Sequence, residues 1–111
     1  MKNFEIKNGI AVIPQGTKEI KHFAFNNCTE LKSVIIPDGV TEIGVMAFRN
    51  CTNLAHIVIP GSVKKIGNFA FENCTSLEKI TLGDNLQTIG EKAFEGTKIN
   101  EIYLGDSIFN V

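Results

Sequence analysis

The chain has 111 residues, of which 43% are hydrophobic and 21% charged, and its formal net charge is −1 at pH 7. Its lysines and glutamates are scattered without forming a basic stripe, which argues against a nucleic-acid partner. No apolar run approaches the roughly 18 residues of a membrane span, so we expect a single soluble domain over residues 1–111, without membrane insertion.

The first predicted element is a β-hairpin that caps the N-terminus. Asn8-Gly9 lies between two stretches of alternating apolar residues and is a strong signal for a two-residue turn. A turn of this length places Ile6 opposite Ala11. We therefore assign residues 1–13 to an N-terminal hairpin cap.

From residue 14 onward the sequence repeats itself every 23 residues. The dipeptide Ala-Phe begins at Ala24, Ala47, Ala70 and Ala93, and cysteine keeps the same spacing at Cys28, Cys51 and Cys74. A fixed period of this length is typical of a solenoid in which each unit stacks on the previous one. We expect about four coils of 22–23 residues between residues 14 and 111, the last of them incomplete.

Each repeat contains a short β-branched stretch, such as residues 34–36, that predicts a strand with one buried face. The connections are too long for hairpins, so these strands should stack in parallel at about 4.8 Å. The stretch around each Ala-Phe pair, such as residues 68–72, predicts one or two helical turns. A left-handed backbone is predicted after each such stretch, at Asn27, Asn50, Asn73 and Gly96.

The C-terminal end of the predicted stack has no hairpin of its own. Ile108 and Val111 align with Leu86 and Ile89, as the beginning of a half-coil. The last predicted strand, residues 102–104, should then have an uncovered edge. This edge favours either a homodimer through the uncapped C-terminal coil or a longer repeat protein of which the chain is a part.

Over residues 10–108 the repeat unit reads L-x-x-L-x-L-P-x-x-V-x-x-I-G-x-x-A-F-x-N-C-T-x, which resembles the leucine-rich repeat and, within it, the BspA-like class. The resemblance implies an α/β solenoid: a right-handed stack with a parallel sheet of short strands on one side and short helical turns on the other. Members are typically bacterial or protozoan surface proteins that bind other macromolecules. The resemblance thus implies a secreted or cell-surface location, although this chain contains no secretory signal.

Cysteine and histidine give no pattern that indicates catalysis. Equivalent cysteines should lie in a straight line about 4.8 Å apart, which suits neither tetrahedral zinc nor a disulfide, so we expect small buried apolar side chains. His22 and His56 are the only histidines, and no glycine-rich loop is placed to hold phosphate. We expect no enzymatic activity, no cofactor and no metal.

The candidate functional residues alternate with the buried ladder and should lie on the solvent side of the parallel sheet. The central column is Val12, Ile35, Val58, Thr81 and Tyr103, and a flanking column contributes His56, Lys79 and Glu101. An exposed apolar stripe of this kind often marks an interaction site. Strand propensity alone is the alternative explanation, because β-branched residues fit any pleated surface.

The sequence therefore favours a non-catalytic module that binds a protein partner through this face, with Ile35 and Val58 at its centre. The alternative is a structural spacer or terminal fragment of a longer repeat surface protein, with no binding activity of its own. Carbohydrate binding is a weaker possibility, since Tyr103 would be the single exposed aromatic on the sheet.

Overall fold

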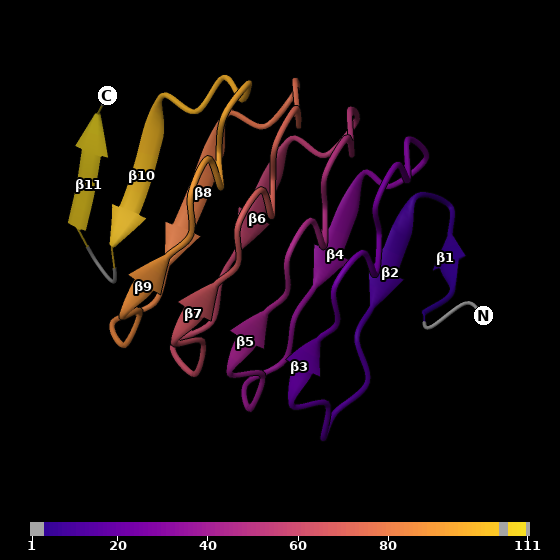
Figure 1. Cartoon of the computed structure of the whole chain (residues 1–111), viewed down its shortest axis with the longest axis horizontal. Coiled ribbons are helices and arrows are strands. Elements are labelled where there is room, and N and C mark those ends of the chain that lie inside the picture. Colours follow the sequence, from indigo (N-terminus) through magenta and orange to yellow (C-terminus); the bar gives the residue numbers. More distant parts are fainter. Residues whose placement is uncertain (1–3, 105–106, 111) are drawn as a thin grey trace.

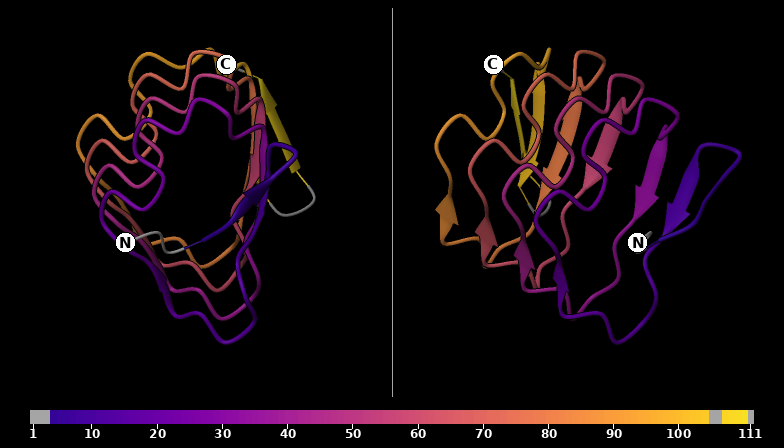
Figure 2. Two further views of the ribbon diagram at one scale, coloured as in Figure 1. Left: turned by 90° about the vertical axis from the view of Figure 1, so that its right-hand side faces the viewer. Right: turned by 45° about the vertical axis from the view of Figure 1, so that its right-hand side comes forward.

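The computed structural model describes residues 4–104 and 107–110, with side chains described for residues 4–104, and shows a stack of coils (Figure 1). In the view along the stack each coil has three walls (Figure 2). We call them the front wall, the back wall and the turn wall. The first two are made of strands, and the turn wall comprises residues 21–28, 44–51, 67–74 and 90–97.

The front wall contains the strands predicted from the sequence and one further strand, β11, that was not predicted. Their bounds are Ile6–Lys7 (β1), Ile10–Val12 (β2), Ser33–Ile35 (β4), His56–Val58 (β6), Lys79–Leu82 (β8), Glu101–Leu104 (β10) and Ser107–Asn110 (β11). They form two hydrogen-bonded sheets, one in the order β1-β2-β4 and the other in the order β11-β10-β8-β6. Strands from successive coils run parallel where they pair, whereas the terminal strands β1 and β11 are antiparallel to their neighbours.

The back wall is a second parallel sheet, which the sequence analysis did not predict. Its strands are Glu19–Ile20 (β3), Glu42–Ile43 (β5), Lys65–Ile66 (β7) and Thr88–Ile89 (β9). Each has only two residues, too few to show an alternating apolar pattern. The apolar residues that recur in these short strands, such as Ile43 and Ile66, are their buried members.

The register confirms that equivalent residues of successive coils are neighbours. Ala11 pairs with Val34, and Ile57 pairs with Ile80, each pair 23 residues apart. In the last coil Ile80 pairs with Ile102, which confirms that this coil is one residue shorter. The columns read from the sequence are therefore real neighbours in space.

The N-terminal hairpin forms as predicted over its described residues. Ile6 pairs with Ala11 in β1 and β2, and Asn8 adopts the left-handed conformation (φ 55°) that a tight turn of this kind requires. The ring of Phe4 stacks on Phe25 with centroids 5.5 Å apart. Residues 1–3 of the predicted cap lie outside the described residues.

The prediction of helical turns was wrong, since no helix occurs among the described residues. In the turn wall alternate amides point in different directions: Ala24 N donates to Lys21 O three residues back, whereas Phe25 N donates to Ala47 O of the next coil. Every second amide of the segment therefore donates to the next coil, and it cannot also donate to a carbonyl within its own segment as a helix requires. Positive φ angles interrupt the segment at the predicted positions, Asn27 (66°), Asn50 (64°), Asn73 (61°) and Gly96 (82°).

The expectation of an uncovered edge at residues 102–104 was also wrong. β11 pairs antiparallel with β10, with Leu104 opposite Ser107. Ile108 therefore belongs to a hairpin strand and not to a half-coil equivalent to Leu86, while Val111 lies outside the described residues. The alignment failed because the chain reverses direction after β10 instead of continuing around the coil.

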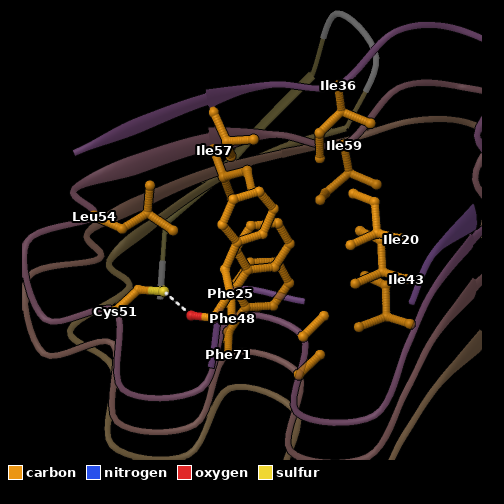
Figure 3. Close-up of a cluster of buried hydrophobic side chains, with 14 of the residues drawn as sticks. Ile20, Phe25, Ile36, Ile43, Phe48, Cys51, Leu54, Ile57, Ile59 and Phe71 are labelled. Atoms are coloured by element: carbon orange, nitrogen blue, oxygen red, sulfur yellow. Dashed lines mark hydrogen bonds between the residues drawn. The ribbon is translucent and has the colours of Figure 1, made fainter. Parts of the chain in front are cut away.

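The core is a continuous column of apolar side chains (Figure 3). Rings of Phe25, Phe48 and Phe71 are fully buried and stack nearly parallel, with centroids 5.2 and 5.0 Å apart. Cys51 and Cys74 are buried beside them, as expected, and the Cys51 thiol donates to Phe25 O at 3.2 Å. A hydrogen bond with Cys74 and burial raise the pKa of the Cys51 thiol, so it stays protonated at neutral pH.

Candidate interaction surface

The central column of predicted site residues lies on the outer face of the front wall. Val12, Ile35 and Val58 are 60%, 55% and 49% exposed, and Ile10 of β2 extends the same apolar area. We call Ile10, Val12, Ile35 and Val58 the apolar stripe. They remain exposed because each alternates along its strand with a buried ladder residue, such as Val34 beside Ile35.

The central column of the front wall becomes more polar and less exposed toward its C-terminal end. Thr81 and Tyr103 follow Val58 in register, but both are only partly exposed. The Tyr103 hydroxyl donates a hydrogen bond to Glu101 Oε1 at 3.0 Å, and the same oxygen lies 3.7 Å from Lys79 Nζ. The hydrogen bond and the charge of Glu101 raise the pKa of Tyr103.

The flanking residues are thus of two kinds. Lys79, Glu101 and Tyr103 form one connected polar group across β8 and β10. His56 is exposed on β6, next to Lys79 in register and two residues from Val58 along the strand. The structure therefore brings all the predicted residues onto one face, with an apolar half and a polar half.

The front wall is interrupted in the middle of the apolar stripe, between β4 and β6. These strands belong to different sheets, although their Cα atoms approach within 8 Å. In neighbouring coils Ile13 N donates to Ile35 O at 3.0 Å and Ile59 N to Thr81 O at 2.7 Å. Within residues 4–104 the equivalent bond from Ile36 N to Val58 O is missing.

A second bond is missing on the other side of the same gap. Glu78 N donates to Ala55 O, and Lys32 N donates to Gly9 O, but the described backbone contains no bond from Ala55 N to Lys32 O. We call this interruption the β4–β6 gap. It leaves backbone donors and acceptors beside the apolar stripe without a partner in the adjacent strand.

The β4–β6 gap opens into a cleft of about 280 Å³. Its lining comprises Ser33, Val34, Ile35, Ile36, His56 and Val58. Val34 and Ile36 are core residues, yet they are 6% and 8% exposed, whereas Ile57 and Ile59 across the gap are 1% exposed. The cleft therefore has an apolar floor, stripe residues on its rim, and a hydroxyl and an imidazole at its edge.

A second exposed apolar column, on the turn wall, was missed by the sequence analysis. Phe23 is 55% exposed, and Met46 and Phe69 are partly exposed at the equivalent positions. All three have φ near +60°, as does Lys92. The apolar residue immediately before the first three Ala-Phe pairs was the signal that could have revealed this column.

The histidines have different environments. His22 Nδ1 accepts a hydrogen bond from Val45 N at 2.8 Å, so this imidazole helps to join two coils. Across residues 4–104, no three His, Cys, Asp or Glu side chains are grouped as metal ligands would be. No helix long and apolar enough to cross a membrane was found in the described part of the chain.

Comparisons with known proteins agree with this architecture. The family model described as "BspA type Leucine rich repeat region (6 copies)" matches residues 2–111. A leucine-rich repeat protein structure from Bacteroides ovatus is 38% identical, with a TM-score of 0.71, over 73% of this chain and 21% of that one. The pneumococcal vaccine antigen PcpA is 28% identical, with a TM-score of 0.82, over 87% of this chain and 24% of that one.

A leucine-rich repeat protein from Bacteroides capillosus has the same fold at 22% identity, with a TM-score of 0.68 over 91% of both chains. No curated protein shows significant similarity to this sequence. The chain spans about a fifth of the Bacteroides ovatus structure and about a quarter of PcpA. With a family match over nearly its whole length, the chain belongs to the BspA-type leucine-rich repeat family.

Proposed function

We propose that the chain is a non-catalytic module that binds a protein partner through the apolar stripe. The observation that supports this proposal is that Val12, Ile35 and Val58, about half exposed, occupy equivalent positions in three successive coils: Val12 pairs with Ile35 in register, and Ile35 and Val58 line the same cleft. Covering such side chains removes apolar area from water, which favours association by roughly 25 cal/mol per Å² before the costs of binding are counted.

The cleft supports a protein partner more than a flat ligand such as a carbohydrate. An apolar side chain of the partner would enter between Ile35 and Val58 and contact Val34 and Ile36. Polar backbone of the partner would meet the unpaired groups that line the β4–β6 gap. Interfaces commonly take most of their affinity from a few anchors in such pockets.

The polar half of the surface would supply selectivity. His56, Lys79 and Glu101 border the stripe with charges of both signs, so a partner would need complementary charges in register. A secreted or cell-surface location fits this role, because family members are typically surface proteins that bind other macromolecules.

The test compares capture of a protein partner by the wild-type chain and by Val58→Lys. We expect the variant to bind at least tenfold more weakly, since it places a charge on the rim of the cleft, and biolayer interferometry would measure the loss. Phe23→Lys is the matched control, because Phe23 is similarly exposed but lies on the turn wall. Equal binding by all three proteins would refute the proposal.

A structural spacer is the second candidate function. It is favoured by one observation: the chain spans only 21% and 24% of two similar structures, so a module of this size can be one part of a longer stack. A chain that captures no partner in its native environment, while remaining folded, would support the spacer role.

A further inference from the structure

The turn wall carries a ridge of side chains that the proposed binding face does not use. The ridge has one member in each coil, at the position before the Ala-Phe pair: Phe23, Met46, Phe69 and Lys92. Phe23 and Lys92 are exposed, and the two members between them are partly exposed. We call these four residues the turn-wall ridge. The turn wall lies across the stack from the front-wall strands (Figure 2), so a molecule that covers the ridge leaves the apolar stripe free.

The backbone of the ridge is strained in every coil. The φ angles of its four members, in chain order, are 64°, 57°, 60° and 55°. Residues with a bulky side chain rarely adopt this left-handed region, and strained positions of this kind cluster where proteins bind other molecules. At Phe23 the result is a ring that is more than half exposed. Strain and exposed apolar surface therefore coincide on the same column.

The charge of the turn wall changes sign along the stack. Its four segments, numbered first to fourth in chain order, carry the charged residues Lys21, Arg49, Glu72, Glu91, Lys92 and Glu95. The first and second segments each contain one cation and no carboxylate, whereas the third and fourth each contain one carboxylate in excess. One half of the wall is therefore positive and the other half is negative.

We infer that a second copy of this chain covers the turn wall, with the two stacks antiparallel about a two-fold axis. The axis passes between the second and third segments, so the first segment of each copy faces the fourth segment of the other. The positive half of each wall then faces the negative half of its counterpart. Such a contact is self-complementary and closes as a dimer. A parallel arrangement would instead place like charges opposite each other in every coil.

The turn-wall ridge is complementary to itself in the same arrangement. Reversing one ridge against the other places Phe23 opposite Lys92 of the second copy and Met46 opposite Phe69 of the second copy. An ammonium group over an aromatic ring and a thioether against an aromatic ring are both favourable contacts. The two-fold axis produces each contact twice. In a parallel dimer Lys92 would meet Lys92 of the second copy, and both kinds of contact would be lost.

The charged residues beside the ridge fit the same pairing. Arg49 Nε lies 2.8 Å from Glu72 Oε1 across the second and third segments, so two such pairs meet near the two-fold axis with opposite charges adjacent. Lys21 faces the fourth segment of the second copy, where Glu91 is exposed. Four coils at about 4.8 Å give a face about 19 Å long, which makes the interface small and the dimer weak. The dimer therefore dissociates in dilute solution.

Sedimentation equilibrium of the 12.2 kDa chain, over a concentration series up to about 1 mM, tests the inference. We expect the mass of the wild type to rise from one chain toward two. Phe23→Lys should weaken the dimer roughly tenfold or more, since it places a like charge opposite Lys92 at two symmetric positions. Val58→Lys is the matched control: it alters a similarly exposed side chain of the front wall and should dimerise like the wild type. Circular dichroism would establish that each variant is folded.

Charge reversal tests the antiparallel orientation. Lys21→Glu and Glu91→Lys should each weaken the dimer by about threefold or more, because each opposes like charges across the interface. The chain that carries both substitutions should recover the affinity of the wild type, because the first and fourth segments have then exchanged their charges. In a parallel dimer these two residues would lie far apart, and the second substitution would not compensate for the first.

A wild type that stays monomeric up to the highest concentration would overturn the inference. So would a dimer that Phe23→Lys leaves intact, a double charge reversal that restores nothing, or an assembly that grows beyond two chains. These outcomes are separate from the capture of a protein partner. Phe23→Lys should lose the dimer and keep partner capture, whereas Val58→Lys should keep the dimer and lose partner capture.

Discussion

Lys21 stands at the position where the later coils have glycine, and the stacking of the coils explains this difference. A Cβ atom at Gly44 would lie 2.6 Å from His22 N, and one at Gly67 would lie 2.7 Å from Val45 N of the preceding coil. Both distances are too short for any side chain. Among residues 4–104 no backbone packs against Lys21 in the way that His22 packs against Gly44, so Lys21 can stand where later coils have glycine.

Tyr103 provides a test at the residue scale. Because Glu101 raises its pKa, we expect the phenol to titrate above its ordinary value near 10, and Glu101→Gln to lower the midpoint toward that value. Tyrosinate absorbance measures the midpoint directly. The folded state holds this proton more tightly, so the stabilisation is complete below pH of about 10 and is lost as the pH rises through the raised pKa.

Glu78→Gln is the control for this titration, since the Tyr103 pKa is shifted by Glu101 and Lys79 and not by Glu78, an exposed carboxylate immediately before β8. Identical midpoints in the wild type and in Glu101→Gln would show that the hydrogen bond does not exist in solution.

Among the elements, the front wall could be predicted and the turn wall could not. Along stretches such as residues 34–36, side chains alternate between the core and the outer face, and this pattern recurs every 23 residues. The pattern therefore predicts the strands, the face on which each side chain lies and the register between coils. The turn wall escaped prediction because its conformation depends on hydrogen bonds to the next coil, such as Phe25 N to Ala47 O, which no local pattern encodes. From sequence alone, its short apolar segments are as compatible with one turn of helix as with the conformation observed.

The candidate surface was predictable for the same reason as the front wall, since alternation assigns each residue to a face. The β4–β6 gap was not, because residues 33–36 and 56–59 are as β-branched and apolar as the strands that do pair. Exposure of Phe23 was missed because a left-handed φ turns its side chain outward.

Hydrogen exchange tests the β4–β6 gap at the scale of the strands. Amides of Ile36 and Ala55 should exchange at least tenfold faster than those of Ile59 and Glu78, their equivalents one coil later, because only the latter are hydrogen-bonded across the wall. NMR-detected exchange resolves the four amides individually. Equal protection of each equivalent pair would show that the front wall is continuous in solution.

For the whole molecule, stability depends on a stack of aromatic rings that runs from Phe4 to Phe94. Successive centroids are 5.0–5.5 Å apart, so each ring covers the face of the next. Because every coil contributes one ring, loss of a central ring should weaken the contacts of three coils at once.

Phe48→Ala measures this contribution. The ring is fully buried between Phe25 and Phe71, and its removal should cost about 3–5 kcal/mol of unfolding free energy, a large share of the roughly 5–15 kcal/mol of a typical domain. Urea unfolding would give the difference. Phe23→Ala removes an exposed ring and should cost far less; comparable losses would contradict a central role for the stack.

The position of Tyr103 has a practical consequence for experiments that measure partner binding. The chain has no tryptophan and a single tyrosine, and that tyrosine lies at the polar end of the proposed binding face. Its ultraviolet fluorescence therefore originates from one point on that face, and a partner that carries tryptophan would quench it by energy transfer on docking. The protein thus contains an intrinsic optical reporter, and contact with this face can be followed without attaching a dye.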